Sequence, residues 1–217
     1  MSEHYYTNQP TSSSNPGETA VRALGMELNF ATDAGVFARG GFDYGSKLLV
    51  ESLPELHGRI LDLGCGWGPI GVLLALKYPE TTVVMSDVNE RALALTKKNI
   101  KRHRLQNAEA ALSDEFQNIA GMFDFIITNP PIRAGKSVIY ALFDAARDRL
   151  NPDGALYIVI RKQHGAPSAL KHLEEVYGHA EVIARDKGFW IIKAYLPSSS
   201  FRPTHVRSAN HPRYGKA

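Results

Sequence analysis

Short, almost wholly apolar runs alternate along the chain with longer segments in which apolar residues recur at helical spacing. The apolar runs predict buried strands at 59–63, 81–87, 108–112, 122–128 and 155–160. The helical spacing predicts helices between and after them, at 72–79, 89–105, 137–150 and 168–178. Consecutive strand–helix–strand units pair in parallel through right-handed crossovers, so this alternation predicts an α/β fold with a mostly parallel sheet and helices on both faces.

Both ends of this pattern carry a hairpin signal. Apolar residues at 21–30 predict a short extended N-terminal hairpin or a pair of short strands, and a helix at 47–56 then leads into the first core strand. Near the other end, Lys187-Gly188 separates two strand-like runs within 180–197, which predicts a hairpin. The sheet is therefore expected to have seven strands, with one antiparallel strand near an edge.

Length and composition place these elements in one domain. The chain has 217 residues, of which 44% are hydrophobic and 22% charged, as in ordinary globular proteins. We expect a flexible polar segment at 1–18, a single domain at 19–197 and a flexible basic tail at 198–217. Outside the tail, 21 Lys and Arg residues face 22 Asp and Glu residues, so the basic surplus belongs to the tail. It consists of Arg202, Arg207, Arg213 and Lys216.

Targeting and cysteine signals bear on location. No apolar run approaches the ~20 residues that cross a bilayer, and residues 1–20 lack the basic start and apolar middle of a secretory signal. The single cysteine, Cys65, cannot form an internal disulfide or build a zinc site alone. The sequence therefore predicts a cytoplasmic protein with no membrane partner and no metal.

A glycine-rich loop, D-L-G-C-G-W-G-P-I-G at 62–71, lies where a buried strand turns into a helix, which is where open parallel sheets bind nucleotides. Residues 66–71 match the dinucleotide pattern GxGxxG, so an oxidoreductase with a nucleotide cofactor has to be considered. However, Pro69 removes an N–H that a pyrophosphate would need, and Asp62 suits a cationic ligand better. S-adenosylmethionine has no phosphate and carries an ammonium and a sulfonium, so the loop favours it.

Two further carboxylates follow strands near this loop. Asp87 ends the second strand and is expected to accept hydrogen bonds from the ribose hydroxyls, a role that does not separate the two cofactors. Asp114 either reaches the adenine amino group or serves as a helix cap or solvated turn residue. Cys65 is expected to pack within the loop and not to act as a nucleophile, and Trp67 to pack against or shield the cofactor.

The segment Asn129-Pro130-Pro131 follows the strand at 122–128 and carries the most information about chemistry. An exocyclic amine of a base is a poor nucleophile, because its lone pair is delocalised into the ring. The Asn129 side-chain oxygen and the Pro130 carbonyl can each accept one N–H, which orients the lone pair toward a methyl donor. Methylation at carbon five of cytosine is excluded, because it needs a cysteine nucleophile and Cys65 lies in the glycine loop.

These motifs together resemble the class I S-adenosylmethionine-dependent methyltransferases, and within them the methyltransferase small domain family. The resemblance runs from about 37 to 197, and the chain is similar to the catalytic half of the RsmC group and to the short stand-alone YbxB type. It implies a single Rossmann-like methyltransferase domain. The segments that carry it are FARGGFDYGSKLLVESLP, ILDLGCGWGPIGV, MSDVNERALALTKKN, FDFIITNPPIRAGKSV and VIRKQHGAPSALKHLEEVYG.

The resemblance also implies which residues bind and act. Asn129, Pro130 and Pro131 would hold the target amine, and Phe37 with the segment 39–43 would form a lid over the cofactor. The family's cofactor-binding positions fall on Phe37, Asp62, Gly64, Cys65, Gly66, Gly68, Asp87, Val88, Asp114 and Asn129. Ile132 departs from the pattern, because enzymes acting on adenine or glutamine amines commonly have an aromatic residue there.

Basic residues indicate the substrate class. With Ile132, we expect Arg133, Lys136, Arg161 and Lys162 to face the mouth of the site, where cations suit phosphates. A second basic surface is either a solvated helix face or an RNA contact; its members are Lys97, Lys98, Lys101, Arg102 and Arg104.

The predicted function is methyl transfer to an exocyclic amine in RNA, most specifically the 2-amino group of a guanine in ribosomal RNA, by a monomer or homodimer. RNA, as ribosomal RNA or a ribosomal subunit, would be the partner. The alternatives are a protein glutamine amide, the adenine 6-amino group, an oxidoreductase, or an inactive binding module.

Overall fold

The computed structural model describes residues 14–34, 36 and 41–197. Its centre is a seven-stranded sheet in the order β5-β4-β3-β6-β7-β9-β8. Within this sheet, β9 alone runs antiparallel to its neighbours, β7 and β8. The strands are β3 (Arg59–Leu63), β4 (Thr82–Asp87), β5 (Ala108–Leu112), β6 (Phe123–Thr128), β7 (Leu150–Arg161), β8 (His179–Asp186) and β9 (Phe189–Tyr195).

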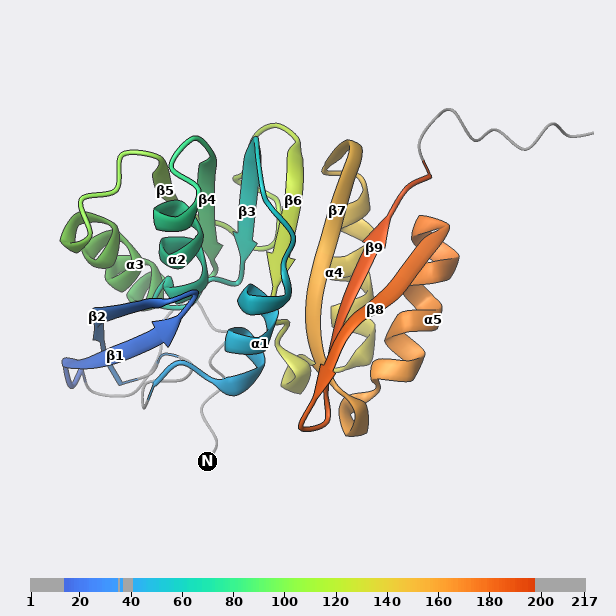
Figure 1. The fold of residues 1–217 in the computed structure, drawn as a ribbon, viewed down its shortest axis with the longest axis horizontal. Coiled ribbons are helices and arrows are strands. Elements are labelled where there is room, and N and C mark those ends of the chain that lie inside the picture. The colour runs from blue at the N-terminus through green and yellow to red at the C-terminus, as the bar shows by residue number, and fades with distance from the viewer. Residues whose placement is uncertain (1–13, 35, 37–40, 198–217) are drawn as a thin grey trace, which may run out of the picture.

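Helices cover both faces of the sheet (Figure 1). The first three pack against one core layer and the last two against the other. Along β3 the side chains alternate between the layers, so Ile60 belongs to the first core and Leu61 to the second. The helices are α1 (Tyr44–Ser52), α2 (Pro69–Lys77), α3 (Glu90–Arg102), α4 (Lys136–Arg147) and α5 (Ala166–Tyr177).

The predicted α/β fold is confirmed, including the seven strands and the antiparallel strand near an edge. The predicted C-terminal hairpin turns at Lys187 and Gly188, which have φ values of 44° and 79°. The segment 151–154 (Asn-Pro-Asp-Gly), which lies between the predicted helix at 137–150 and the predicted strand at 155–160, has the composition of a turn. Instead it forms a bulge inside β7, because Phe123 pairs with Leu150 while Phe125 pairs with Ala155.

The predicted N-terminal hairpin is present as β1 (Gly17–Ala23) and β2 (Met26–Thr32). Strand β1 therefore includes Gly17 and Glu18, the last two residues of the segment 1–18 that was expected to be flexible. The Asn99 side chain anchors the hairpin: it accepts from Ala31 N at 2.8 Å and donates to Ala31 O at 3.0 Å and to Trp67 O at 2.8 Å. The hairpin is therefore tied to the outer side of the glycine loop.

Helix ends follow local sequence signals. Pro69 begins α2 three residues earlier than predicted, because its fixed φ and missing N–H suit the first turn of a helix. Asn89, the first residue of the helix predicted at 89–105, caps α3 by accepting hydrogen bonds from Arg91 N and Ala92 N. Of the helices that the structure describes, none combines the length and hydrophobicity that a membrane-spanning segment requires.

Candidate active site

A cleft of about 270 Å³ opens at the carboxyl ends of the central strands. Both predicted motifs line it, because β3 and β6 are neighbours in the sheet and their following loops emerge side by side. The Thr128 hydroxyl donates to the Leu63 carbonyl oxygen at 2.8 Å and ties the two strand ends together. The glycine loop and the Asn-Pro-Pro segment therefore share one cleft.

The predicted site residues divide into those that line the cleft and those that lie around it. The lining residues are Gly64, Cys65, Gly66, Asp87, Val88, Asp114, Asn129, Pro130 and Pro131. Those outside the lining are Asp62, Gly68, Ile132, Arg133, Lys136, Arg161 and Lys162. Phe37 and residues 39–40 of the expected lid lie outside the described residues, whereas Phe42 and Asp43 line the cleft.

The glycine loop presents its backbone to the cleft. Gly64, Gly66 and Gly68 have φ values of 74°, 60° and 87°, which only glycine adopts without cost. A Cβ atom at Gly64 or Gly66 would meet no described atom within 4 Å, whereas one at Gly68 would lie 3.0 Å from Thr96. The first two glycines therefore leave room for a ligand, and the third permits close packing against α3.

Asp62 supports this loop from behind. Its carboxylate is buried and accepts a hydrogen bond from Gly71 N at 2.9 Å, nine residues along the chain. Burial raises the pKa of Asp62 to about 7, against the lowering effect of the Gly71 hydrogen bond and with a smaller raising effect from the nearby charge of Asp87. A protonation change at neutral pH is thereby built into the base of the loop.

Asp87 faces the cleft at the end of β4. Its two carboxylate oxygens accept hydrogen bonds of 2.8 Å from Gly66 N and from Asn89 N, and burial raises its pKa. Each carboxylate oxygen has a second lone pair, so Asp87 can still accept hydrogen bonds from a diol. Asp114 lies exposed at the rim, and its backbone carbonyl accepts from Gln117 N at 3.1 Å, so it both starts a turn and lines the cleft.

Cys65 and Trp67 are packing residues of the loop. The Cys65 sulfur lies 3.6 Å from the Thr96 hydroxyl, and burial raises the pKa of the thiol well above its ordinary value, so it is not a thiolate nucleophile. Trp67 is buried and packs edge-on against Phe30 of β2, with 5.1 Å between ring centroids. It also lines the cleft, so its ring joins the hairpin to the site.

The Asn129 side chain is oriented by residues far away in the sequence. Its Nδ2 donates to the Ser46 hydroxyl at 3.0 Å and lies 3.5 Å from both carboxylate oxygens of Asp43. A carboxylate only accepts, so the amide nitrogen must face Asp43. Among the described residues, Asn129 Oδ1 accepts no hydrogen bond, which leaves this oxygen as an acceptor for a molecule in the cleft.

Ile132, predicted to contact the substrate, lies outside the described lining of the cleft. The short helical turn 132–134 directs its partly buried side chain against the core layer of α4 and α5. Ala134 and Val138 line the cleft in its place, and Val138 is 46% exposed. An apolar contact to a bound base would therefore come from the first turn of α4, a position that the motif alone does not indicate.

The four cations predicted to face the mouth are exposed and lie outside the described lining of the cleft. Two of them are held by aromatic rings. The Arg161 guanidinium lies 4.4 Å from the centroid of Phe189, and the Lys136 ammonium lies 5.0 Å from that of Tyr140. Such contacts keep a cation in place while one side of it stays open to solvent.

Comparison with known proteins identifies the family. The profile of the Methyltransferase small domain matches residues 27–193. The chain belongs to this family. YbxB of Bacillus subtilis, which is described as uncharacterized, is 44% identical over 198 residues, 89% of this chain and 98% of YbxB. The ribosomal RNA small subunit methyltransferase C of Vibrio vulnificus is 36% identical over 182 residues, 81% of this chain and 52% of that protein.

A solved structure extends this result. The T. thermophilus 16S rRNA N2 G1207 methyltransferase RsmC, in complex with AdoMet and guanosine, has a TM-score of 0.75 at 28% identity. The match covers 87% of this chain and 52% of that one, so this methyltransferase small domain protein spans about half the length of its RsmC relatives. The predicted S-adenosylmethionine-dependent methyltransferase class is confirmed, and the oxidoreductase interpretation of the glycine loop is not retained.

Sequence reasoning missed the two partners of Asn129. Asp43 is the N-cap of α1 and accepts from Ser46 N at 3.1 Å, a pattern that the local sequence D-Y-G-S before a helix could have indicated. The contact of this cap with Asn129 had no local signal, because 86 residues separate Asp43 from Asn129. Only the packing of α1 against the sheet, at β7, β8 and β9, brings them together.

Proposed function

We propose that this protein transfers a methyl group from S-adenosylmethionine to the 2-amino group of a guanine in ribosomal RNA. The observation that carries the proposal is the orientation of Asn129, a residue that lines the cleft: its amide nitrogen is held by Ser46 and Asp43, and its oxygen accepts no hydrogen bond from the described residues. Its relatives support the substrate class, because several are named as ribosomal RNA small subunit methyltransferases and one solved relative holds AdoMet and guanosine.

The cleft fits a nucleoside cofactor that is cationic and has no phosphate. Gly64 and Gly66 leave their backbone accessible, and Asp87 and Asp114 supply carboxylates on the same side of the cleft. Pro69 occupies the start of α2, where an N–H would be needed to bind an anion. In this proposal the glycine loop, braced by Asp62, holds the methionine part, Asp87 the ribose, and Asp114 the adenine.

The target amine would lie between this half of the cleft and Asn129. When bound, the cofactor supplies an electrophilic methyl group on a sulfonium. Asn129 Oδ1 and the Pro130 carbonyl oxygen each accept one N–H of the amine, which directs the nitrogen lone pair toward that methyl. Orientation of this kind contributes up to ~7–11 kcal/mol in well-aligned reactions.

The bonds and charges balance without a strong general base. A nitrogen–carbon bond forms as the carbon–sulfur bond breaks, which leaves a neutral thioether, S-adenosylhomocysteine. The methylated amine is then positively charged and acidic, and it releases one proton to solvent. This agrees with the described lining of the cleft, in which the Cys65 thiol is protonated and no histidine takes part.

Transfer to RNA tests the proposal. Ribosomal RNA from a strain that lacks the gene is incubated with the protein and methyl-labelled cofactor, and the RNA is then digested to nucleosides and analysed by mass spectrometry. We expect the label in N2-methylguanosine. Label in N6-methyladenosine, or label in ribosomal protein and none in RNA, would assign the site to an adenine or to a glutamine amide instead.

A further inference from the structure

Cations and aromatic rings alternate where the turn between β8 and β9 meets the first residue of α1. The Lys187 ammonium lies 4.3 Å from the centroid of the Tyr44 ring, and the Arg161 guanidinium lies 4.4 Å from that of Phe189. The Tyr44 and Phe189 centroids are 5.9 Å apart. The Tyr44 hydroxyl donates to Asp186, which fixes the Tyr44 ring beneath Lys187. We call these five residues the cation–aromatic cluster.

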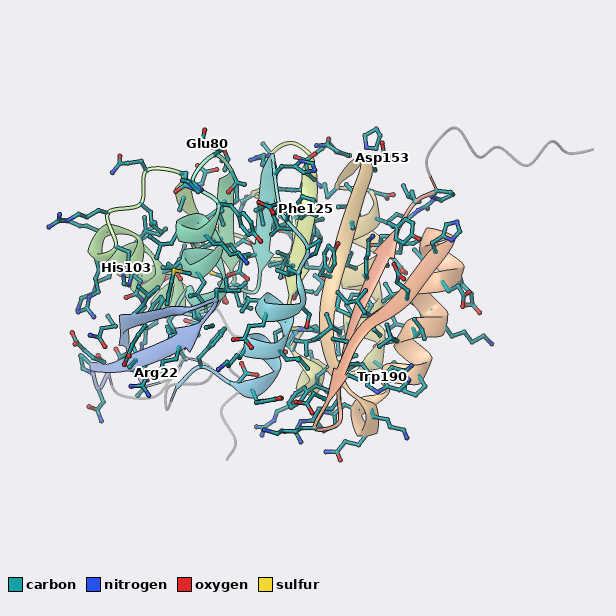
Figure 2. All side chains as sticks on the ribbon, viewed as in Figure 1. Arg22, Glu80, His103, Phe125, Asp153 and Trp190 are labelled. Atoms are coloured by element: carbon teal, nitrogen blue, oxygen red, sulfur yellow. The ribbon has the colours of Figure 1, made fainter. Side chains whose placement is uncertain are left out.

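This cluster adjoins the target side of the cleft. Gly45, in the first turn of α1, has no room for a side chain: a Cβ atom there would lie 2.7 Å from the Phe189 ring and 3.2 Å from the Asp43 carboxylate. Phe189 is therefore packed directly on the turn that orients Asn129. Figure 1 shows the β8–β9 turn beside α1, at the same edge of the sheet, and Figure 2 labels Trp190 there.

Exposed cations gather at this edge of the sheet, where Asp186 is the carboxylate of the cation–aromatic cluster. Six exposed cations lie at or next to the carboxyl ends of β7 and β8 and at or just before the start of α4. They are Arg133, Lys136, Arg161, Lys162, Arg185 and Lys187. None of them forms an ion pair with a carboxylate of the described residues. Arg185 lies 4.2 Å from the Trp190 ring centroid, on the opposite face of the same hairpin.

Aromatic rings hold cations in place without neutralising their charge. A carboxylate partner would neutralise the cation, whereas a ring face holds it and leaves its N–H donors available. Because a target base stays covalently linked to its own phosphates, those phosphates must pass close to the mouth of the cleft. Exposed, ring-held cations beside that mouth fit the phosphates on either side of the base.

We propose that the cation–aromatic cluster binds the phosphates of a single-stranded RNA segment next to the target guanine. This inference rests on the proposed function and adds the path that the substrate takes beyond the cleft. Lys187 and Arg161 contact phosphates, and Tyr44 and Phe189 hold these two cations. Asp186 opposes RNA by its charge while it fixes Tyr44, so its net effect on RNA affinity is unfavourable.

Binding of a labelled single-stranded RNA of about 12 nucleotides with one guanine tests this, with S-adenosylhomocysteine present to prevent turnover. Lys187→Glu should raise the Kd by about 5–10-fold and lower the slope of log Kd against log salt by at least about 1. Lys77→Glu is the matched control, because Lys77 also lies over a tyrosine ring, at 5.3 Å from the Tyr78 centroid, but at the C-terminal end of α2. That end of the helix leads to Glu80, which Figure 2 labels at the opposite edge of the molecule from Trp190. The Kd and slope of Lys77→Glu should equal those of the wild type.

Asp186→Asn supplies a change of opposite sign. The amide keeps an oxygen acceptor for the Tyr44 hydroxyl but removes the negative charge, so RNA should bind about 2–3-fold more tightly. A loss of affinity in this variant, at an unchanged melting temperature, would contradict the charge argument. Equal Kd values and slopes for Lys187→Glu and Lys77→Glu would overturn the inference.

Failure of the inference is distinguishable from failure of the proposed function. If the wild-type protein forms N2-methylguanosine in ribosomal RNA but Lys187→Glu binds RNA normally, only the cation–aromatic cluster is wrongly assigned. If the wild type neither methylates guanine nor binds the oligonucleotide, both fail together. Tighter binding to polyglutamate than to RNA, weakened by Lys187→Glu, would overturn the RNA assignment and indicate an acidic protein partner.

Discussion

The two halves of the cleft are built in different ways. In the glycine-loop half, functional side chains bond to backbone atoms at short to moderate separation in the chain: Asp62 to Gly71 N, 9 residues away, and Asp87 to Gly66 N, 21 residues away. In the target half, the bonds join side chains 83 residues apart, Asn129 to Ser46, and 142 residues apart, Tyr44 to Asp186. The first half is a local motif, whereas the second exists only when α1, β6 and β9 have packed together.

This difference separates binding from turnover. If the glycine-loop half holds the cofactor and the target half orients the amine, changes in one half should alter cofactor affinity and changes in the other should alter rate.

Asn129→Ala removes the acceptor oxygen that orients the amine. We expect kcat for RNA to fall by at least ~100-fold, as when a transition-state hydrogen bond is lost, while the Kd for S-adenosylmethionine stays nearly unchanged. Single-turnover transfer and calorimetric titration with the cofactor measure the two quantities separately. A wild-type rate in this variant would contradict the role of Asn129.

Asp62→Asn tests the neutral state of the carboxyl that braces the glycine loop. The raised pKa of about 7 means that the stability this group contributes is fully present below its ordinary pKa near 3.8 and is lost as the pH rises through 7. Asn keeps an oxygen for Gly71 N but cannot ionise. Between pH 5 and 7.5 the wild type should therefore lose about 2–3 kcal/mol of unfolding free energy relative to the variant.

Denaturant titrations of both proteins across this pH range provide the measurement. Curves of unfolding free energy that stay parallel from pH 5 to 7.5 would show that Asp62 ionises normally and that burial does not control it.

Asp87→Ala removes the carboxylate that faces the cleft from β4. The Kd for S-adenosylmethionine should rise by roughly tenfold or more, since a hydrogen bond to a charged group contributes about 1.5–3 kcal/mol. The rate at saturating cofactor should change much less than in Asn129→Ala. An unchanged Kd, measured by the same titration, would remove Asp87 from the cofactor half of the cleft.

Ser46→Ala removes the hydroxyl that accepts from Asn129 Nδ2 and should lower kcat about 3–10-fold, with little effect on cofactor affinity. Because Ser46 acts through Asn129, adding Ser46→Ala to Asn129→Ala should lower the rate no further. Additive losses in this double-mutant cycle would show that Ser46 affects the reaction by another route.

The comparison of the two halves also explains what the sequence could predict. The strand–loop–helix order, the positive-φ glycines and the Asn89 cap depend on residues within a few positions of each other, and the structure agrees with them. The roles proposed for Asp87 and Asn129 followed from strand ends. The positions of Ile132 and Val138 depended on a short helical turn after Pro131, which the motif does not specify.

The long-range partners had no such signal. Ser46 read as an ordinary helix start, Asp43 was expected in a lid over the cofactor, and Tyr44, Lys187 and Phe189 read as unrelated helix, turn and strand residues. Their contacts depend on how closely α1 approaches β9, which Gly45 permits because it lacks a side chain. A single sequence shows the glycine but not the ring against which it packs.

A crystal structure of the protein with S-adenosylhomocysteine and guanosine tests the central claim most directly. The account predicts both ligands in the one cleft, with the guanine 2-amino nitrogen about 3–3.5 Å from the site of the transferred methyl carbon and donating to Asn129 Oδ1. Guanosine bound elsewhere, or bound in the cleft with its 2-amino group turned away from Asn129, would contradict it.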